Sequence, residues 1–335
     1  MKLIIPMAGR GTRVRPHSHT TPKPLLPVAG KMIVERIVET FGRTLEGSID
    51  EIVFILGPDF GQDIKDQLTA MCERQHAKPT FRVQEAAEGT AHAVYCAKED
   101  LNGECIIVFA DTIFDMEGSV SIEDADSIVW LKEVDDPSRF GVAVEKDGKI
   151  TDFVEKPDKP ISNLAIIGVY YFKEASDLKK EIKYLLDNNI RGKGNEYQLT
   201  DALDRLLKDD KVFRKATVDE WLDCGTLPAW RETSGVIVEK EATDIDESQF
   251  EDTTINQPVY IGEDVELVGC EIGPYASIGA GCSLKNSSVK NSLIQVHTTI
   301  EDSQIEDSTI GKHVELKSVD QQVHLGDHSK VGIEV

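Results

Sequence analysis

The pattern of apolar positions divides the chain into a longer first part and a shorter second part. Over the first 240 residues, short apolar runs alternate with segments of helical period, and this alternation is typical of an α/β sheet. The strand-like runs lie at residues 3–6, 51–56, 81–84, 105–109, 127–131, 140–144 and 165–172, and a late helix at 196–208. Apolar residues at helical spacing, which we expect in the core, are Ile33, Val34, Ile37, Val38 and Phe41.

The second part has a different period. Residues 241–257 are acidic and lack a strong period, which predicts a linker. From Ile261, apolar positions recur every five or six residues, a spacing that fits neither a helix nor an alternating hairpin. It predicts a β-helix of hexapeptide-type repeats, with glycines at its corners and roughly three to four coils of ~18 residues each. The apolar positions are Ile261, Leu267, Ile272, Ile278, Leu284, Val289, Ile294, Ile300, Ile305, Ile310 and Leu316, and the glycines are Gly262, Gly273, Gly279 and Gly311.

Composition narrows the classes of partner. The 335 residues include 37 Lys and Arg against 60 Asp and Glu, a net charge of −23. A chain with this net negative charge is not expected to bind nucleic acid or an anionic membrane surface. Acidity is greatest over residues 241–335, with 18 acidic and 5 basic residues. A solvated surface explains this excess, and adaptation to high salt is the alternative.

The six cysteines are scattered and show no CxxC or Cys/His spacing, so we expect reduced thiols rather than a zinc site. The first apolar run is interrupted by Pro6 and Gly9, too early for a signal peptide. No stretch approaches the ~20 apolar residues of a membrane span. We therefore expect a cytoplasmic protein.

One segment carries most of the chemistry. Residues 9–28, called here the signature loop, read GRGTRVRPHSHTTPKPLLPV and follow the first apolar run. A glycine-rich turn after a strand presents backbone N–H groups to phosphate oxygens. Gly9, Gly11 and Thr12 form that turn, and Arg13 and Lys23 add two cations beside it. The order predicts a polyphosphate site, although neither the P-loop nor the dinucleotide fingerprint is present.

The string GxGTR followed by PKPLLPV resembles the signature of the sugar-1-phosphate nucleotidyltransferases, the nucleoside-diphosphate-sugar pyrophosphorylases. It is close to the glucose-1-phosphate thymidylyltransferase and uridylyltransferase branch, of which several longer members carry a C-terminal left-handed β-helix. The resemblance covers about residues 1–235 and 258–316. It implies a Rossmann-like mixed-sheet catalytic domain over 1–240, the linker over 241–257, and a short left-handed parallel β-helix with a tail over 258–335.

The resemblance also implies roles for the phosphate-binding and metal-binding residues. Arg13 would contact the triphosphate, and Lys23 the phosphates at the reacting centre. Asp111 and Asp223, the latter in Trp221–Thr226 (WLDCGT), would supply carboxylates to Mg²⁺. Asp111 also follows a buried-looking strand, at the end where open α/β sheets bind ligands. Ala110 stands where the family commonly has glycine.

Two further groups correspond to nucleotide and sugar contacts. Gln84, Gly89 and Thr90 lie in QEAAEGTAHA, which resembles the loop that binds the pyrimidine base in this family. The amide of Gln84 suits this role, because it can pair with N3–H and a carbonyl of the base. By resemblance, the sugar phosphate is bound by Gly141, Glu155, Lys156, Asn163 and Glu196. Met32 and Asn195 depart from the commoner proline and glycine, and we expect no chemical effect from either change.

The expected activity is Mg²⁺-dependent transfer of a nucleotidyl group from dTTP or UTP to a hexose-1-phosphate, favouring glucose-1-phosphate. Alternatives are a mannose-1-phosphate guanylyltransferase and a non-catalytic regulatory or scaffold subunit of the same fold. A bifunctional enzyme with an acyltransferase β-helix is a third alternative, but the β-helix histidines lack a recognisable acyltransferase context. We expect a homo-oligomer in which the β-helix serves assembly or fold support rather than chemistry.

Overall fold

The computed structural model describes residues 1–9, 11–45, 47–116, 125–146 and 148–333. The last two residues of the expected C-terminal tail therefore lie outside the described residues. Contacts divide the chain into two compact units. The first unit consists of Met1–Gly9 and Ile37–Trp221, and the second of Arg10–Arg36 and Leu222–Val335. Most of the signature loop thus belongs with the C-terminal part of the chain.

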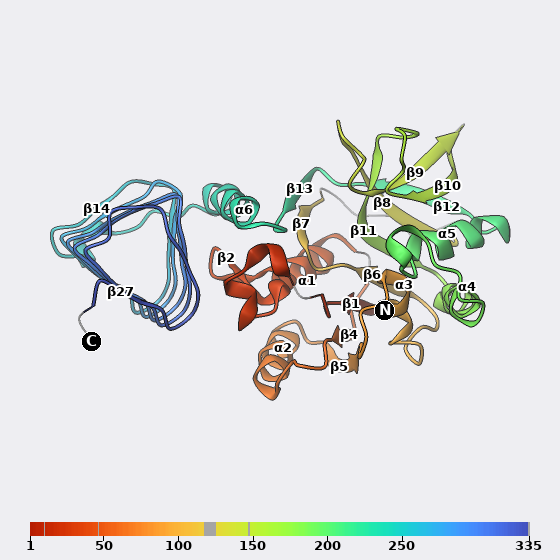
Figure 1. Cartoon of the computed structure of the whole chain (residues 1–335), viewed down its shortest axis with the longest axis horizontal. Helices are drawn as coiled ribbons and strands as arrows, with labels where there is room; N and C mark the ends of the chain where they lie inside the picture. The colour runs from red at the N-terminus through yellow and green to blue at the C-terminus, as the bar shows by residue number, and fades with distance from the viewer. Residues whose placement is uncertain (10, 46, 117–124, 147, 334–335) are drawn as a thin grey trace. The chain divides into compact units, whose positions relative to one another are not determined.

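The first unit is built on a nine-stranded mixed sheet, the α/β architecture that the sequence predicts. Its central order is β10-β9-β11-β6-β1-β4-β5, and β8 joins β11 to β12 (Figure 1). Strands β1, β4, β5 and β6 run parallel, whereas β11 is antiparallel to β6, β8 and β9. The bounds are β1 Lys2–Pro6, β4 Glu51–Leu56, β5 Lys78–Val83, β6 Cys105–Val108, β8 Ser127–Glu133, β9 Gly141–Lys146, β10 Lys149–Glu155, β11 Leu164–Phe172 and β12 Phe213–Thr217.

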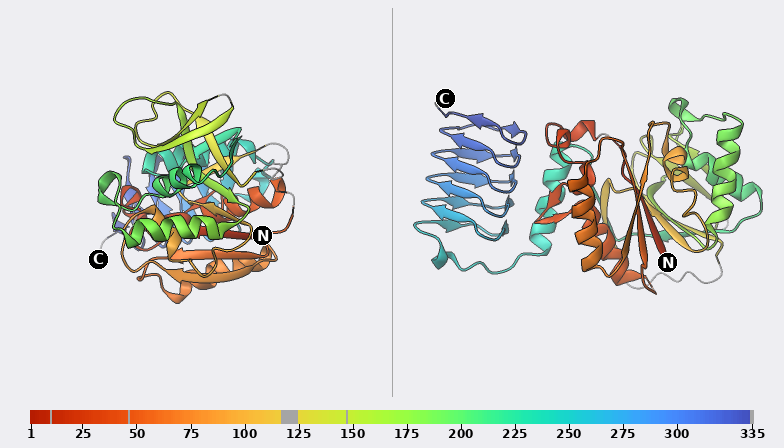
Figure 2. Two further views of the ribbon diagram at one scale, coloured as in Figure 1. Left: turned by 90° about the vertical axis from the view of Figure 1, so that its right-hand side faces the viewer. Right: turned by 90° about the horizontal axis from the view of Figure 1, so that it is seen from below.

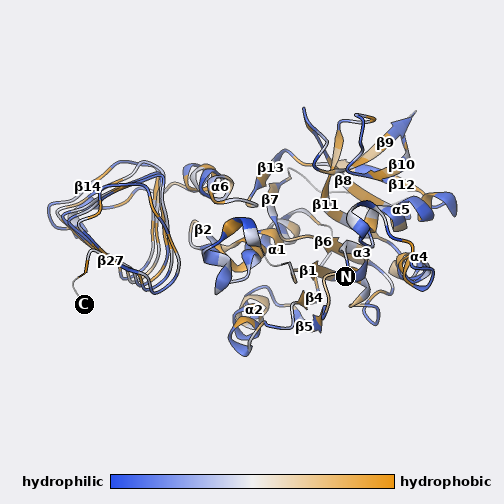
Figure 3. Cartoon of the chain, viewed as in Figure 1, coloured by the Kyte–Doolittle hydropathy of each residue, from blue (hydrophilic) through white to orange (hydrophobic). Residues whose placement is uncertain are grey.

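Amphipathic helices cover this sheet. Leu199, Leu203 and Leu206 on α5 are buried with Leu178 and Ile182 on α4, in one cluster that also contains residues of β1, β4 and β6. Figure 3 shows the central strands as mainly apolar, which fits strands covered on both faces. The helices of this unit are α2 Gln62–Arg74, α3 Thr90–Tyr95, α4 Ala175–Asp187 and α5 Leu199–Lys208. Helix α1, Ile33–Thr44, continues from the second unit into the first.

Helix α5 begins at Leu199, three residues later than the sequence suggested. Gln198 precedes it in an extended conformation, and Gly194 within η4 (Lys193–Asn195) is left-handed, with φ of 72°. Tyr197 uses its backbone N–H and carbonyl to pair with Glu88 and Ala91 instead of continuing the helix. A tertiary contact therefore overrides the local helical pattern at 196–198.

The second unit contains a parallel β-helix of left-handed form, as the repeat predicts. Its sheets have the orders β14-β17-β20-β23, β15-β18-β21-β24-β26 and β16-β19-β22-β25-β27, and Figure 2 shows the stacked coils. The expected three to four coils are too few, because two of the sheets hold five strands each. Coils are also shorter than ~18 residues: Val259 pairs with Ala276, Ser277 with Leu293, and Thr309 with His324, at separations of 17, 16 and 15 residues.

The strand bounds of the β-helix are β14 Thr254–Ile255, β15 Val259–Ile261, β16 Glu266–Val268, β17 Glu271–Ile272, β18 Ala276–Ile278, β19 Ser283–Lys285, β20 Ser288–Lys290, β21 Leu293–Ile294, β22 Thr299–Glu301, β23 Gln304–Glu306, β24 Thr309–Ile310, β25 Glu315–Lys317, β26 His324–Leu325 and β27 Lys330–Val331. Strand β14 thus starts inside the segment expected to be a linker, which also contains η5, Glu247–Gln249. The predicted apolar positions form a continuous core, with Ile261 partly buried.

The corners of the β-helix differ from the sequence expectation. Among the four predicted corner glycines, only Gly273 has positive φ, at 96°. A Cβ on Gly262 or Gly279 would instead lie 2.6 or 2.7 Å from a backbone nitrogen of the next coil, so these positions need glycine for close approach. Left-handed corners are occupied mostly by polar residues that tolerate this conformation, as in the series Asp264, Gly281, His297, His313 and His328.

The second unit also contains the signature loop and helix α6, Leu227–Lys240. Trp230 of α6 is fully buried, and its Nε1 donates to the Pro27 carbonyl at 2.9 Å. The short elements of this part are η1 Thr12–Val14, η2 His17–His19, η3 Lys23–Leu25, β2 Pro27–Val28 and β3 Lys31–Met32. The two remaining short strands are β7, Thr112–Asp115, and β13, Glu220–Asp223. None of the helices in the described ranges is long and apolar enough to cross a membrane.

Candidate active site

The phosphate turn expected from the sequence is built around Gly11. This residue precedes η1 with φ of 55° and ψ of 36°, the left-handed region that glycine adopts most readily. Ser18 Oγ donates to the Gly11 carbonyl at 2.7 Å. A Cβ on Gly11 would lie 3.1 Å from Lys23 Cβ, so the turn packs closely against the lysine. Gly11 and Lys23 are therefore brought together, whereas a Cβ on Gly9 would meet nothing within 4 Å.

Arg13 and Asp223 lie beside the same glycine in the second unit. A Cβ on Gly225 would lie 3.2 Å from Arg13 Nη2 and 2.7 Å from Asp223 Oδ1. The Gly225 N–H donates to Asp223 Oδ1 at 2.7 Å, and Thr233 Oγ1 of α6 donates to the Asp223 carbonyl at 2.7 Å. The expected triphosphate cation is thus next to one expected metal carboxylate, and both side chains are exposed.

Asp111 lies in the first unit, just beyond the C-terminal end of β6. The preceding segment is fixed by Phe109, whose N–H donates to the Gly168 carbonyl at 3.0 Å. Gly168 has φ of 82° and lies where the pairing of β11 with β8 shifts register between Ile166 and Tyr170. A bulge of this kind redirects the neighbouring chain and is frequent near active sites. The carboxylate is exposed at the end of the strand, as the sequence predicts.

Gln84 follows β5 and is buried, with 7% of its surface exposed. Its Nε2 lies 3.1 Å from His92 Nδ1 on α3. The amide nitrogen can only donate, so His92 Nδ1 is the acceptor of this contact, and His92 Nε2 lies 3.8 Å from the Glu88 carboxylate. Within the described residues, Gln84 Oε1 has no hydrogen-bond partner, so His92 orients the amide and leaves an acceptor available. The sequence motifs did not indicate this orienting contact of His92.

The loop after Gln84 is attached to the start of α5. The Ala91 N–H donates to the Tyr197 carbonyl, and the Tyr197 N–H donates to the Glu88 carbonyl, both at 2.9 Å. Gly89 lies between them with φ of 118°, and a Cβ there would approach the Tyr197 carbonyl to 2.4 Å. Thr90 Oγ1 accepts from the Leu199 N–H at 2.9 Å. Tyr197 thus supports the loop. In the sequence, the string EYQLTD at residues 196–201 was the feature that could have indicated this role.

Glu155 is the centre of the expected sugar group. Its Oε2 accepts from Thr200 Oγ1 at 3.3 Å, and its Oε1 lies 3.8 Å from Lys156 Nζ. Burial is the main cause that raises the pKa of Glu155, and the nearby Lys156 ammonium opposes it. A Cβ on Gly141 would lie 2.9 Å from Glu155 Oε2. Lys156 has φ of 42°, a strained conformation for a non-glycine residue that is often found at functional positions.

Asn163 and Glu196 make different contacts from this group. Asn163 Nδ2 donates to Glu133 Oε1, and Glu196 Oε2 accepts weakly from Gln198 Nε2 at 3.4 Å. Both side chains are exposed, and no described hydrogen bond joins either of them to Glu155. The structure therefore brings together Gly141, Glu155 and Lys156. The charge of Glu196 contributes to raising the pKa of Glu155, so Glu196 lies near this group, whereas no described contact joins Asn163 to it.

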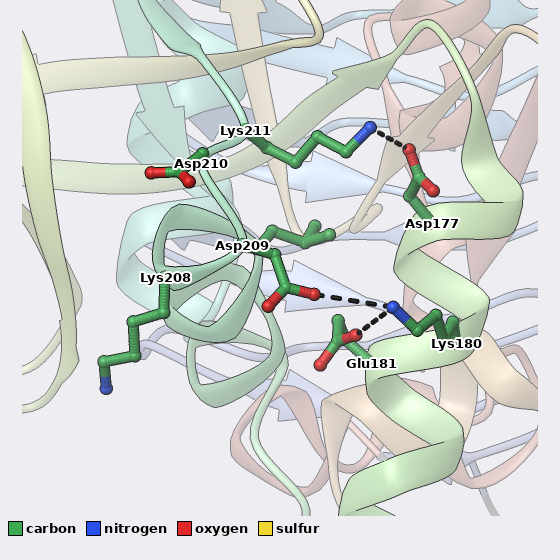
Figure 4. Close-up of a pocket in the computed structure, with 8 residues that line it drawn as sticks. Asp177, Lys180, Glu181, Lys208, Asp209, Asp210 and Lys211 are labelled. Carbon is green, nitrogen blue, oxygen red and sulfur yellow. Dashed lines mark hydrogen bonds and ion pairs between the residues drawn. The ribbon is translucent and has the colours of Figure 1, made fainter.

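A cavity of about 380 Å³ lies between α4 and the segment that follows α5 (Figure 4). None of the expected site residues lines it. Lys180 is 3.6 Å from Glu181 and 3.5 Å from Asp209, and Lys211 pairs with Asp177. Its cations thus already have carboxylate partners, and we do not assign the reaction to this cavity.

The two aspartates have the right chemistry for Mg²⁺, which takes hard oxygen ligands and is commonly held by one or two carboxylates together with substrate phosphates. Asp223 is oriented by the Gly225 N–H through one oxygen, and the side chain remains exposed. Asp111 is exposed at the end of its strand. Among the described residues, no group of three or more His, Cys, Asp or Glu side chains could hold an ion without other ligands. These observations fit an ion held partly by substrate phosphates.

Comparison with known proteins places these features in a family. A family model described as "Nucleotidyl transferase" matches residues 2–240, most of the chain. The chain belongs to this nucleotidyltransferase family. The chain is 29% identical to a low-salt glycan biosynthesis nucleotidyltransferase, Agl11, of Haloferax volcanii, covering 99% of this chain and 98% of the relative.

Other similar proteins agree with this assignment. The chain is 28% identical to a glucose-1-phosphate thymidylyltransferase of Streptomyces griseus, covering 99% of both chains. It is 32% identical to the bifunctional protein GlmU of Methanocaldococcus jannaschii, over 78% of this chain and 60% of that protein. A solved UDP-glucose pyrophosphorylase complexed with UDP-glucose matches with a TM-score of 0.59 and 25% identity, over 72% of this chain and 99% of that structure. Sugar-1-phosphate nucleotidyltransferase activity is therefore supported.

Proposed function

We propose that this enzyme transfers the nucleotidyl group of dTTP or UTP to glucose-1-phosphate. The products are a nucleoside-diphosphate-glucose and pyrophosphate. Support comes from two glucose-1-phosphate thymidylyltransferases of Streptomyces, which are similar to the chain over at least 99% of its length. A structural neighbour was solved with UDP-glucose, a product of the proposed kind.

The orientation of Gln84 carries the base assignment. With Nε2 held near His92 Nδ1 at 3.1 Å, the amide offers Oε1 as an acceptor. Uracil and thymine carry an N3–H donor, whereas cytosine and adenine present an acceptor at the corresponding ring nitrogen. The same oxygen could accept from guanine N1–H, so we infer that exclusion of GTP depends on the size of its two-ring base.

The charged residues of the expected site have proposed roles that follow from their chemistry. Arg13 and Lys23 bind phosphate oxygens, with the Gly9–Thr12 turn beside them. Glu155 accepts from sugar hydroxyls and Lys156 binds the sugar phosphate. Mg²⁺, held by Asp111 and Asp223 together with substrate oxygens, supplies charge neutralisation when bound. The attacking sugar phosphate is already anionic, so positioning and charge stabilisation suffice without a general base.

A panel assay tests the proposal. Pyrophosphate release is measured with ATP, CTP, GTP, UTP and dTTP, each against glucose-, galactose-, mannose- and N-acetylglucosamine-1-phosphate in the presence of Mg²⁺. We expect the highest kcat/KM for dTTP or UTP with glucose-1-phosphate. A higher value for GTP with mannose-1-phosphate would make the protein a guanylyltransferase, and no release with any pair would make it a non-catalytic subunit.

We also propose that the enzyme acts in the cytoplasm as a homo-oligomer. The last strands of the β-helix, β26 and β27, are not fully buried, and short solenoids commonly gain stability by packing against another surface. Light scattering on the purified full chain measures the oligomer directly. A monomer at all concentrations tested would refute this part of the proposal.

A further inference from the structure

We propose that the β-helix supports the signature loop, and that His17 is the positioning residue through which it orders the phosphate-binding turn. The inference rests on the proposed function for its catalytic consequence. Its structural part concerns only the second unit, to which both the loop and the β-helix belong. The sequence assigned no role to His17.

His17 is buried against a polar row of the β-helix, with 1% of its surface exposed. Its Nδ1 lies 3.0 Å from Gln295 Nε2, and its Nε2 lies 2.9 Å from Thr309 Oγ1. Thr309 Oγ1 also lies 2.9 Å from His324 Nδ1. These contacts form a relay of consistent polarity: Gln295 donates to His17, His17 to Thr309, and Thr309 to His324.

The neighbours of this relay make it specific for a neutral imidazole. Burial lowers the pKa of His17 to about 4, so the ring is uncharged near neutral pH. Trp230 of α6 packs edge-on against the ring, with the centroids 5.2 Å apart. Gln295 Oε1 is buried and, within the described residues, has no hydrogen-bond partner. Loss of the His17 ring would leave further buried polar groups of the β-helix without partners, which is costly.

Other contacts attach the same stretch of loop to neighbouring coils. Thr20 Oγ1 donates to Asp327 Oδ2 at 2.7 Å, and Lys312 Nζ donates to Thr21 Oγ1 at 3.0 Å. A Cβ on Gly326 would lie 3.2 Å from Pro16 Cβ. The loop is thus attached to the β-helix over residues 16–21, and His17 is the buried member of the set.

These attachments lead directly to the residues assigned to phosphate. Ser18, next to His17, donates to the Gly11 carbonyl and so fixes the left-handed turn that precedes Arg13. The same turn packs against Lys23. Displacement of His17 would therefore release the Gly11 turn, and with it the two cations.

A second route runs through α6. Arg231 Nη1 donates to the Asp307 carbonyl of the β-helix at 2.7 Å. On the same helix, Thr233 holds the Asp223 carbonyl, and Trp230 holds the Pro27 carbonyl at the end of the loop. The β-helix thus braces both Arg13 and Asp223, which lie beside Gly225, and we infer that it takes part in catalysis by ordering these groups.

The test uses a β-helix residue that lies outside the substrate-binding set. Thr309→Val removes the hydroxyl that joins His17 to His324. Thr298→Val is the matched control, because both threonines are 0% exposed and Thr298 Oγ1 bonds only within the β-helix, to Gly311 and Val314. Thermal melts verify that both variants are folded. Hydrogen exchange of residues 11–26 in the full chain and steady-state kinetics are then measured.

We expect Thr309→Val to raise amide exchange at residues 11–26 and to lower kcat/KM at least about tenfold, with the larger change in KM for the triphosphate. Thr298→Val should change neither by more than about twofold. Equal effects of the two variants, or no change at residues 11–26 in Thr309→Val, would overturn the proposal. Exchange needs no substrate, so a chain inactive with every substrate pair would refute the proposed function while the exchange result still decides the support role.

Discussion

At the scale of single residues, hydrogen bonds decide which atoms a side chain presents. The contact between Gln84 and His92 holds the amide nitrogen and leaves the amide oxygen to a ligand. The Gly225 N–H likewise holds one oxygen of Asp223 beside the Arg13 guanidinium. The sequence indicated Gln84, Asp223 and Arg13 through motifs. Their partners His92 and Gly225 lie in the same motifs, but the motifs did not indicate which atoms pair.

The Gln84 contact gives a prediction about base preference. Gln84→Ala removes a buried hydrogen-bonding amide, which should weaken transition-state binding of UTP and dTTP by on the order of 1–3 kcal/mol. The kcat/KM for both triphosphates should fall by the corresponding factor. The values for ATP and CTP should change less, so the preference narrows. Gln67→Ala on the exposed face of α2 is the control. If the ratio of kcat/KM for UTP to kcat/KM for CTP is the same in the Gln84 variant as in the wild type, the assignment of the base contact is wrong.

The two aspartates give a prediction about metal dependence. Asp111→Asn and Asp223→Asn should each lower turnover at saturating Mg²⁺ by ~10²-fold or more, because each removes an anionic oxygen ligand. Isothermal titration with Mg²⁺ and triphosphate should show weaker joint binding. Asp244→Asn, at an exposed position outside the site, should behave like the wild type. Normal rates in both folded site variants would exclude them as metal ligands.

Burial of His17 gives a prediction about pH. Its pKa falls from 6.5 to about 4 on folding, so the unfolded chain binds more protons between these values. The free energy of unfolding therefore has its full value above pH 6.5 with respect to this group. It decreases by on the order of 3 kcal/mol as the pH falls towards 4. Of the facing charged groups, Asp327 raises this pKa and His324 lowers it.

Urea unfolding of the wild type and of His17→Asn at pH 7, 5.5 and 4.5 measures the effect. The variant should lose less stability on acidification, whatever its stability at pH 7. Parallel pH profiles for the two proteins would show that His17 does not contribute as described.

At the scale of elements, the strands and the β-helix repeat were predictable because their apolar periods are local. Strand β4 has the bounds that the pattern gives, and Ile272, Ile278 and Ile294 are buried as expected. The number of coils was underestimated, because the repeat shortens towards the C-terminus and the first coil begins in a segment without a strong period. The late start of α5 was also unpredictable, since it depends on pairing between Tyr197 and the loop at 88–91.

The loop at 88–91 gives a prediction at this scale. Gly89→Ala should destabilise the protein by roughly 2 kcal/mol or more, because residue 89 has a φ of 118° that disfavours alanine and the new Cβ would lie 2.4 Å from the Tyr197 carbonyl oxygen. It should also weaken binding of the nucleotide. Gly103→Ala is the matched control: its φ is 61°, and its added Cβ would meet nothing within 4 Å. Equal melting temperatures for the two variants would contradict the steric argument.

At the scale of the whole molecule, the sequence divided the chain by composition at residue 240, whereas contacts unite residues 10–36 with the C-terminal part. The difference arises because the polar contacts of His17, Thr20 and Thr21 leave no periodic signal. The similarity to the Haloferax volcanii nucleotidyltransferase covers 99% of this chain and so includes the residues of the β-helix.

The central claim is that the enzyme moves a nucleotidyl group, and isotopic labels test it most directly. The full chain is incubated with Mg²⁺, glucose-1-phosphate and dTTP or UTP labelled at the α- or the γ-phosphorus. We predict that the α-label appears in the nucleoside-diphosphate-glucose and the γ-label in pyrophosphate, and that both depend on the sugar phosphate. Release of the γ-label as orthophosphate, or an α-label that stays in free nucleotide, would contradict the account.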